Sequence, residues 1–422
     1  MPKGKPAVLI AGAGPVGMFA AIALAKRGIR TQIVDSGVWT CSHSYALTLH
    51  HDSIELLNEI GLAERVWDVA YPVRKIGFYD AAGPKAQVHL DGNGLAVVRQ
   101  SAIEDMFEKT LRDLDTPVCW KHEVTAAGNE RDSAVATIDK FENDPHDAES
   151  ADLEVAFVLG ADGHHSQVRQ ALGLEFPEVG PAQYYAVFEF KSDIDLANEM
   201  RIVLGDRTTD VLWPMPDGFC RWSFQLPDYA DTEAEQLKDR LLAAGFGHFP
   251  TKRLKDRAPD SAEWRNPPGL DREHLDALIA ERAPWFTGSV ADLSWGAIVR
   301  FERRLSSAFG RGRIWLAGDS AHVTAPAGVQ SMNLGLLEAD ELAEHFAGIL
   351  QGRTSLDTLG SYNGRWTAIW RQLHGLERGL RATPETDPWI GQYADRLIAC
   401  LPTHGDGLAI LASQLGLVAT AK

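Results

Sequence analysis

The chain has 422 residues, 45% of them hydrophobic, and its 58 acidic against 41 basic residues give a formal net charge of −17. This length exceeds one simple core and indicates two domains, either sequential or intertwined. No basic patch stands out, which argues against a nucleic-acid partner. The cysteines have no paired spacing, so we expect neither a disulfide framework nor a metal site. They are Cys41, Cys119, Cys220 and Cys400.

No apolar run approaches the roughly 18 residues of a membrane span. The N-terminal segment MPKGKPAVLIAGAG leads straight into a strand and a glycine turn, which leaves no room for the apolar core of a signal peptide. We therefore expect a cytoplasmic protein.

The first chemical motif is a glycine-rich turn near the N-terminus. An apolar strand at residues 7–11 is followed by the turn GAGPVG and a helix. This context, with Asp35 about 20 residues further on, predicts a dinucleotide site. Gly12 and Gly14 let the backbone approach a pyrophosphate, Gly17 lets helix and strand pack closely, and Asp35 would bind an adenosine ribose.

Two later strands also end in polar turns. Residues 156–159 form a strand that ends in Gly160-Ala161-Asp162-Gly163, and residues 313–317 form one that ends in Gly318-Asp319. From Met332 the apolar positions take helical spacing. The start of this helix would make an anion-friendly pocket. There Asp319 can accept from a ligand hydroxyl, and Asn333 can hydrogen-bond the edge of a planar heterocycle.

Hydrophobic periodicity predicts the remaining elements. Residues 129–152 are polar, and we expect a hairpin tip or an exposed loop there. Residues 231–288 should be mostly helical, with a charged loop at 253–268. Other helices are expected at 52–62, 101–114, 356–378 and 387–416, with turns at Pro384 and Pro402. Further strands are expected at 73–79, 85–90, 183–191, 201–204, 210–213, 219–226 and 293–300.

The strand at 219–226 has a clear alternation. Because side chains alternate between the faces of a strand, Cys220, Trp222 and Phe224 share one face. Arg221, Ser223 and Gln225 share the other. A ligand pocket needs a few convergent polar groups in apolar surroundings, so we predict that the polar face meets the ligand.

Taken in order, the stretches AGAGPVG, GADGHHSQVRQ and RIWLAGDSAH…P…N resemble those of single-component FAD-dependent aromatic hydroxylases, flavoprotein monooxygenases of the para-hydroxybenzoate hydroxylase fold. The resemblance covers about residues 6–380. It implies an α/β fold in which a Rossmann-like FAD-binding domain is interleaved with a β-sheet substrate domain, plus C-terminal helices. The implied FAD-binding segments are 1–72, 91–181 and 293–380, the substrate segments are 73–90 and 182–292, and the helices occupy 381–422.

The resemblance also implies roles for individual residues. Gly12, Gly14 and Gly17 would cradle the FAD pyrophosphate, and Asp35 would bind the adenosine ribose. Arg99 would lie near the ribityl–phosphate chain, and Asp162-Gly163 would contact both FAD and NAD(P)H. Gly318-Asp319 would meet the ribityl hydroxyls. The flavin ring would lie against Pro326 and the loop that contains Gly328, Ser331, Met332 and Asn333.

Two departures stand out. The family's late loop is commonly Gly-Gly-Gln-Gly-Met-Asn, whereas this chain has Val329 and Ser331 at two of the glycine positions. Such glycines allow close backbone approach and flavin movement. The family also often has an arginine early in the segment 41–49, where His43 or Tyr45 is nearest in this chain.

The implied activity is an NAD(P)H-driven monooxygenation of an aromatic or polyketide-like small molecule by O2, through a flavin C4a-hydroperoxide. No single catalytic acid or base follows from the sequence, and a homodimer is compatible with it. The substrate-facing candidates are His50, Tyr185, Arg201, Trp213, Arg221, Ser223 and Gln225.

Three alternatives stay open. A flavin-dependent halogenase typically carries GWxWxIP, which the strings around Trp213 and Trp295 do not match. A flavin reductase acting on polyprenyl or carotenoid-like substrates would favour a long apolar tunnel. A non-catalytic FAD-binding module is compatible with the altered late loop.

Overall fold

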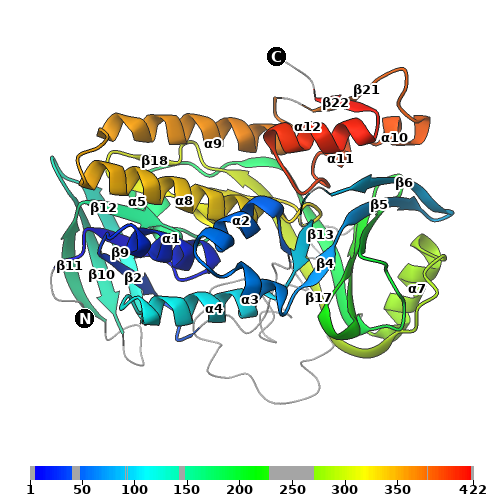
Figure 1. The fold of residues 1–422 in the computed structure, drawn as a ribbon, viewed down its shortest axis with the longest axis horizontal. Helices are drawn as coiled ribbons and strands as arrows, with labels where there is room; N and C mark the ends of the chain where they lie inside the picture. The colour runs from blue at the N-terminus through cyan, green and yellow to red at the C-terminus, as the bar shows by residue number, and fades with distance from the viewer. Residues whose placement is uncertain are drawn as a thin grey trace.

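The computed structural model describes residues 5–39, 48–90, 92, 94–141, 148–227, 270–377 and 379–419. Two large sheets lie side by side, with helices around the first and a C-terminal helical group next to both (Figure 1). This is the expected α/β architecture. His43 and Tyr45, the residues of the early-segment departure, lie outside the described residues.

The first sheet carries the dinucleotide motif. Its strands are parallel from β19 to β8, as expected for a sheet covered on both faces. Only β18 runs antiparallel to its neighbour. The order is β18 (Gly310–Arg311), β19 (Ile314–Leu316), β12 (Phe157–Gly160), β1 (Val8–Ala11), β2 (Thr31–Asp35) and β8 (Cys119–Trp120).

Helices cover this sheet and supply its core. The α1 helix is almost entirely buried, because its run of Ala, Ile, Leu and Phe has no polar face. It packs against both α4 and α8. The helices of this unit are α1 (Pro15–Lys26), α2 (His51–Glu59), α3 (Ala63–Trp67), α4 (Gln100–Asp113), α5 (Gln167–Ala171), α8 (Gln330–Leu350) and α9 (Leu359–Leu373), with 3-10 turns η4 (Gly318–Ser320) and η5 (Leu356–Thr358).

Two smaller sheets complete the unit. One is an antiparallel meander of β9 (His122–Asn129), β10 (Ala134–Lys140) and β11 (Glu149–Val155). The other joins β3 (Thr48–Leu49), β7 (Leu95–Val97) and β4 (Tyr71–Val73). The structure has a hairpin over 129–152, one of the two expectations for that range, and the alternative of an exposed loop is wrong for the residues of β10 and β11. Ala134, Ala136 and Ile138 alternate with polar residues and are buried, so β10 packs one face on the core.

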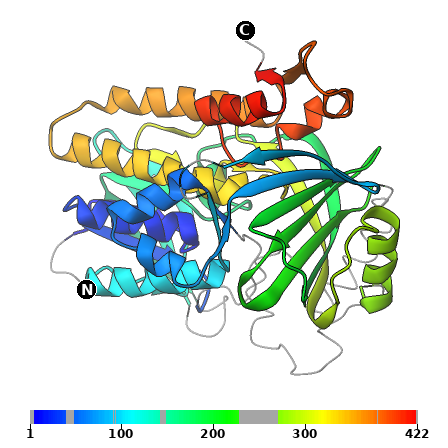
Figure 2. The ribbon, with the colours of Figure 1, turned by 45° about the vertical axis from the view of Figure 1, so that its right-hand side comes forward.

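The second large sheet is antiparallel except for the β14–β5 pair. Figure 2 shows it beside the first unit, with α7 (Arg272–Arg282) on its far face. Its order is β20 (His322–Val323), β17 (Ala291–Leu305), β13 (Glu178–Lys191), β16 (Phe219–Gln225), β15 (Thr209–Pro214), β14 (Glu199–Leu204), β5 (Lys75–Asp80) and β6 (Gly83–His89), with η1 (Pro216–Gly218) joining β15 to β16.

The C-terminal group packs on this second sheet and shares an apolar cluster with Trp213 and Ala327. The helical region expected at 387–416 has the turn predicted at Pro402, which separates α11 from α12 near Gly405 with its positive φ, and it has a further break at Tyr393 between α10 and α11. The elements are β21 (Leu380–Ala382), α10 (Pro388–Gln392), α11 (Ala394–Leu397), α12 (Gly405–Gln414) and β22 (Leu417–Ala419). Within the described ranges, no helix combines the length and hydrophobicity that crossing a membrane requires.

Candidate functional site

The glycine turn between β1 and α1 has the geometry of a phosphate cradle. Gly12 has φ +100°, and a Cβ there would lie 2.1 Å from the Ala161 carbonyl oxygen. A Cβ on Gly17 would lie 2.0 Å from the Gly12 oxygen, whereas one on Gly14 would meet no protein atom within 4 Å. Gly12 and Gly17 are therefore required by the packing of the chain itself. Gly14 leaves open space in front of the N-terminus of α1, where an anion is favoured.

Asp35 ends β2 beside this turn. Its Oδ2 accepts a hydrogen bond from the Ala13 N–H at 2.8 Å, and its Oδ1 accepts one from the Gly37 N–H at 2.5 Å. The carboxylate thus fixes the turn. A carboxylate has about four acceptor sites, so it retains capacity for a ribose hydroxyl.

Asp162 follows β12 at the same edge of the sheet. Its Oδ2 accepts from the N–H groups of Gln167 and Val168 at 2.8 and 3.2 Å, and burial raises its pKa. The Oδ1 atom is buried, and no other described atom hydrogen-bonds it. Buried polar atoms are rarely left without a partner, so this oxygen fits a ligand donor. The neighbouring Gly163 has φ +79° and open space at its Cβ position.

The turn after β19 is held from behind by a buried carboxylate. Gly318 has φ +66°, and its N–H donates to Glu338 Oε2 at 2.8 Å. Glu338 is fully buried and also accepts from Trp370 Nε1 at 2.8 Å, and it pairs with His322 Nε2 at 2.9 Å. Asp319 therefore stands half-buried on a fixed turn, where the Ser331 hydroxyl donates to its Oδ1 at 2.5 Å.

The late loop has a strained residue where the family commonly has glycine. Val329 has φ +48° and ψ +42°, a left-handed conformation that is costly for a β-branched side chain. Interactions around it hold this conformation in place: Asn333 Nδ2 donates to the Val329 oxygen at 2.8 Å, and Val329 packs on the C-terminal apolar cluster. Pro326 is half-buried in the same loop, and Met332 is buried in the first turn of α8.

The structure corrects the role predicted for the Asn333 side chain. Its Oδ1 accepts from the His50 N–H at 2.7 Å and from Ser53 Oγ at 2.8 Å, while its Nδ2 donates to Thr48 and Val329 oxygens. The amide is thus fully engaged within the protein and does not present itself to a heterocycle. The Asn333 amide instead holds the backbone of the late loop in place.

His50 lies against the same loop. Its Nε2 hydrogen-bonds the Gly328 oxygen at 2.9 Å, and burial lowers its pKa to about 3. A neutral ring whose Nε2 meets a carbonyl must be a donor there. His50 therefore braces the loop as a neutral imidazole.

The C-terminal segment contributes a contact that the sequence reasoning missed. A Cβ on Gly328 would lie 2.7 Å from the Ala399 oxygen, and Gln330 Nε2 donates to the Leu401 oxygen at 3.2 Å. Arg396 donates to the carbonyls of Gly205 and Thr208 in the β14–β15 turn. The segment thus joins the late loop to the second sheet, and no local motif in its sequence signals this.

One face of the second sheet turns toward the first unit, and we call it the inner face. It is defined by register across β16, β13 and β17. Its rows are Gln225–Tyr185–Val299, Ser223–Val187–Ala297 and Arg221–Glu189–Trp295. Tyr185, Val187, Ala297 and Val299 form a small apolar cluster of their own, separate from the three larger cores. Polar side chains flank this apolar centre, as a site for an aromatic ring requires.

The other face packs against α7. Trp222, Phe224 and Cys220 lie there in one apolar cluster with Leu275 and Ile279 of that helix. The alternation predicted for β16 is therefore confirmed. The Gln225 side chain, however, accepts from the Thr209 N–H at 2.8 Å, so its carbonyl is already used within the sheet.

The two remaining strand candidates, Arg201 and Trp213, lie on different faces of the sheet. Arg201 lies on the α7 face, where its Nε donates to Glu199 at 2.8 Å and its guanidinium stacks 5.3 Å from the Tyr79 ring. The structure does not bring it together with Arg221. Trp213 pairs with Arg221 in register but is buried in the cluster shared with the C-terminal helices.

Glu189 joins the two units at one end of the inner face. It accepts from Arg221 at 2.8 Å and from Arg99, the residue that precedes α4. Burial alone would raise the pKa of Glu189, but Arg221 and Arg99 outweigh it and the pKa is lowered. Sequence reasoning missed Glu189, because nothing local marks a carboxylate whose partners lie 32 and 90 residues away.

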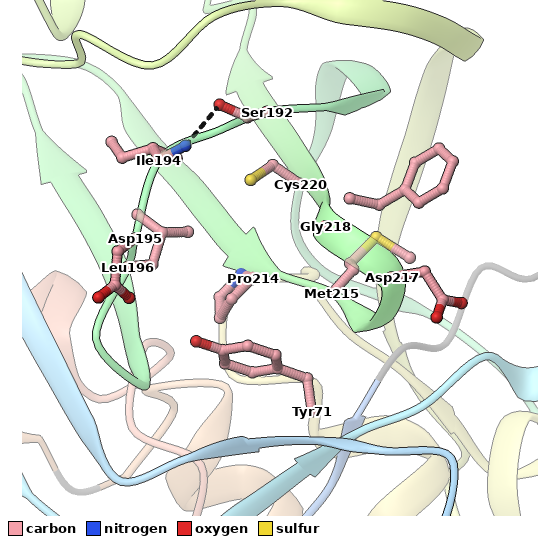
Figure 3. A pocket seen from close by; sticks show the side chains of 11 residues that line it. Tyr71, Ser192, Ile194, Asp195, Leu196, Pro214, Met215, Asp217, Gly218 and Cys220 are labelled. Atoms are coloured by element: carbon pink, nitrogen blue, oxygen red, sulfur yellow. Dashed lines mark hydrogen bonds between the residues drawn. The ribbon is translucent and has the colours of Figure 1, made fainter.

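A cavity of about 330 Å³ lies next to this junction (Figure 3). Its walls come from Tyr71, the loop after β13 and the β15–β16 hairpin. The Arg99 guanidinium lies 5.5 Å from the ring of Phe219, one of the lining residues. None of the residues predicted from the sequence lines this cavity.

Known proteins resemble this chain at low identity over most of its length. It is 27% identical over 369 residues to the 6-methylpretetramide 4-monooxygenase of Streptomyces rimosus. It is 24% identical over 378 residues to the pentachlorophenol 4-monooxygenase of Sphingobium chlorophenolicum. The alignments cover 85% and 87% of this chain but 58% and 63% of those proteins, so it spans only part of their length.

Solved structures show the same fold. The p-nitrophenol 4-monooxygenase of Pseudomonas putida has a TM-score of 0.66 at 19% identity, over 96% of this chain and 93% of that one. The anhydrotetracycline hydroxylase of Streptomyces rimosus has a TM-score of 0.63 at 22% identity, over 98% of this chain and 76% of that one. Residues 5–374 match the FAD binding domain family, and the chain belongs to that family.

Proposed function

We propose that the protein is an FAD-dependent, NAD(P)H-driven monooxygenase that hydroxylates an aromatic or polyketide-like small molecule. The observation that carries this proposal is the inner face, an apolar cluster with flanking polar groups, held beside an FAD-binding unit by Glu189 and Arg99. The relatives named as 6-methylpretetramide and pentachlorophenol monooxygenases support the same reaction class.

The residues at the carboxyl edge of the first sheet fit FAD. The open space at Gly14 and the N-terminus of α1 would take the pyrophosphate, and Asp35 would take the adenosine ribose. Asp319 would accept from the ribityl chain, and the buried Oδ1 of Asp162 would accept a further donor. Bound FAD would supply the hydride and oxygen chemistry, and the protein would supply orientation and a dry site.

The helix α8 would contribute to the electrostatics of this chemistry. Its N-terminus, at Gln330, carries partial positive charge, which favours negative charge on a heterocycle beside it. Asn333, His50 and the Ala399–Leu401 segment hold that terminus still. Hydrogen-bond donors that are already held in place stabilise the charge that develops during a reaction, because they do not have to move first.

The inner face would hold the substrate. Val187, Ala297 and Val299 would contact the ring, while Tyr185 and Ser223 would orient its polar groups. Arg221 already donates to Glu189. Its positive charge toward the substrate would therefore be shared with that carboxylate. We further propose the division into FAD-binding segments (1–72, 91–181, 293–380) and substrate segments (73–90, 182–292) as the functional one.

The test is a turnover assay on the purified, FAD-loaded protein. NADH and NADPH oxidation and oxygen uptake are measured with p-nitrophenol, pentachlorophenol and anhydrotetracycline as probes. We expect at least one ring to accelerate both rates and to yield a product with one added oxygen atom. Loaded protein that consumes neither coenzyme faster with any of these rings would contradict the proposal and favour a non-catalytic FAD-binding module.

A further inference from the structure

Asp35 has two tryptophans beside it at the carboxyl edge of the first sheet. Trp120 is its partner in register on the neighbouring parallel strand β8. Trp39 follows in the segment after β2, where Gly37 fixes the backbone. The Gly37 N–H donates to Asp35 Oδ1 at 2.5 Å, and the Gly37 oxygen accepts from the Lys121 N–H at 2.9 Å. The acidic residue that closes the dinucleotide motif is thus flanked by two indole rings.

The two indole rings are held in place and yet remain accessible. Their planes are 23° apart and their centroids 6.5 Å apart, an offset stacked arrangement that aromatic pairs prefer. The Arg112 guanidinium of α4 lies 5.4 Å from the Trp39 ring centre and adds a cation–π contact. Trp39 is nevertheless 52% exposed, and the adjoining Val38 is 45% exposed. Single exposed apolar residues are normal, but adjoining ones beside a second ring indicate a surface for an apolar or aromatic ligand.

We propose that Trp39 and Trp120 bind the adenine ring of FAD by stacking. The inference rests on the proposed function, in which Asp35 takes the adenosine ribose. Adenine is bonded directly to that ribose, so its ring must lie beside the Asp35 carboxylate, where the two tryptophans are. Every base has a π-face, so an aromatic surface binds it without the need for hydrogen bonds to its edge.

Stacking at this place would make the protein select FAD over FMN. FMN lacks the adenosine monophosphate half of FAD, so it cannot contact either tryptophan while its flavin ring occupies the same place. In FAD the adenine is separated from the flavin ring by the pyrophosphate and the ribityl chain. The contact would therefore add affinity for the cofactor without taking part in the reaction.

The experiment is a titration of the apoprotein with FAD and FMN, followed by flavin fluorescence, and with ADP, followed by calorimetry. Trp39→Ala should raise the Kd of FAD and of ADP roughly tenfold, the loss expected when the aromatic partner of one base is removed. It should leave the FMN Kd unchanged. ADP carries adenine, ribose and pyrophosphate without a flavin, so it isolates the proposed contact.

Two conservative variants separate stacking from apolar bulk. Trp39→Phe keeps an aromatic face and should retain most of the affinity for ADP, whereas Trp39→Leu keeps only apolar bulk and should lose about as much as Trp39→Ala. The control Trp389→Ala removes a half-buried tryptophan that lies edge-on to Tyr393 at 5.1 Å, in α10 at the opposite end of the molecule from β2 (Figure 1). It should change none of the Kd values, and thermal unfolding checks that each variant is folded.

Unchanged FAD and ADP Kd values in Trp39→Ala would overturn the inference. An equal loss of FMN affinity, or equal losses in Trp39→Phe and Trp39→Leu, would also refute it, because Trp39 would then act through the turn and not by stacking. A loss confined to NADPH, titrated beside the others, would assign the rings to the adenine of the coenzyme instead. None of these measurements needs turnover. A protein that shows the stacking pattern but hydroxylates no probe contradicts only the proposed function, and one that hydroxylates a probe with an unaffected Trp39→Ala variant contradicts only the stacking.

Discussion

Single carboxylates determine the geometry of the candidate FAD site. Asp35 accepts backbone N–H groups with both carboxylate oxygens, and Asp162 does so with one. Each of them fixes a turn in this way. Asp319 differs, because the hydrogen bond that it accepts comes from the Ser331 hydroxyl, a side-chain donor that can rotate away. A ligand hydroxyl can thus reach Asp319 without breaking the backbone structure around it.

We expect Asp319→Ala to weaken FAD binding by about one to two decades, or about 1.5–3 kcal/mol, because a charged acceptor of a ligand hydroxyl is lost. The fold should persist, since Gly318 remains bonded to Glu338. Equilibrium titration with FAD measures the effect, and Asp357→Ala, in the exposed η5 turn, serves as the control. Equal affinity of the Asp319 variant and the wild type would show that Asp319 does not contact FAD.

Secondary-structure elements explain what the sequence could and could not predict. Alternation in β16 correctly divided its residues between two faces, because a strand has a period of two whatever its neighbours are. The sequence also showed that Val329 stands at a position where the family commonly has glycine. It did not show that Val329 takes a left-handed conformation. That conformation follows from bonds to Asn333 and packing on the C-terminal cluster, and these contacts are long-range. Glu189 and the segment at 399–401 were missed for the same reason.

The two faces of β16 should respond differently to truncation. Trp222 is fully buried among Phe224, Trp285 and Phe286, so Trp222→Ala should lower the free energy of unfolding by about 3–5 kcal/mol. Ser223→Ala on the inner face should change stability little and should raise KM for an active probe. Urea unfolding and steady-state kinetics separate the two effects. A stable but inactive Trp222 variant would indicate that the aromatic face meets the substrate.

At the scale of the whole molecule, buried imidazoles should make the fold sensitive to acid. Burial lowers the pKa of His374 to about 3, and neither ring nitrogen hydrogen-bonds another described atom. The unfolded chain therefore binds a proton more readily than the folded one below about pH 6.5. The stability that this group contributes is complete above that pH and is lost as the pH falls from about 6.5 toward 3. His50 acts in the same direction.

Replacing the His374 ring should reduce the loss of folding stability as the pH falls. His374→Phe keeps an aromatic group beside Trp370, which lies 5.7 Å away, and removes the proton-binding site. At pH 5 the variant should retain about 2 kcal/mol of unfolding free energy that the wild type loses, because the loss is roughly 1.4 kcal/mol per pH unit below the pKa of the unfolded chain. Denaturant unfolding at pH 7.5 and pH 5 measures the difference. His89→Phe, on the exposed surface of β6, should leave the pH dependence unchanged, and an equal acid response of His374→Phe and wild type would contradict the expectation.

The register of the inner face, the proposed substrate site, has a consequence for altering substrate range. Because the face consists of three short rows on three hydrogen-bonded strands, its nine positions are defined by backbone pairing and not by loop conformation. Strand positions hold side chains more reproducibly than loops do. The glutamate–arginine pair occupies one row, which leaves six positions in the other two rows that can be exchanged without disturbing a buried ion pair. A combinatorial library confined to those six, scored by oxygen uptake on a panel of rings, would therefore sample new specificities while the scaffold and its flavin edge stay unchanged.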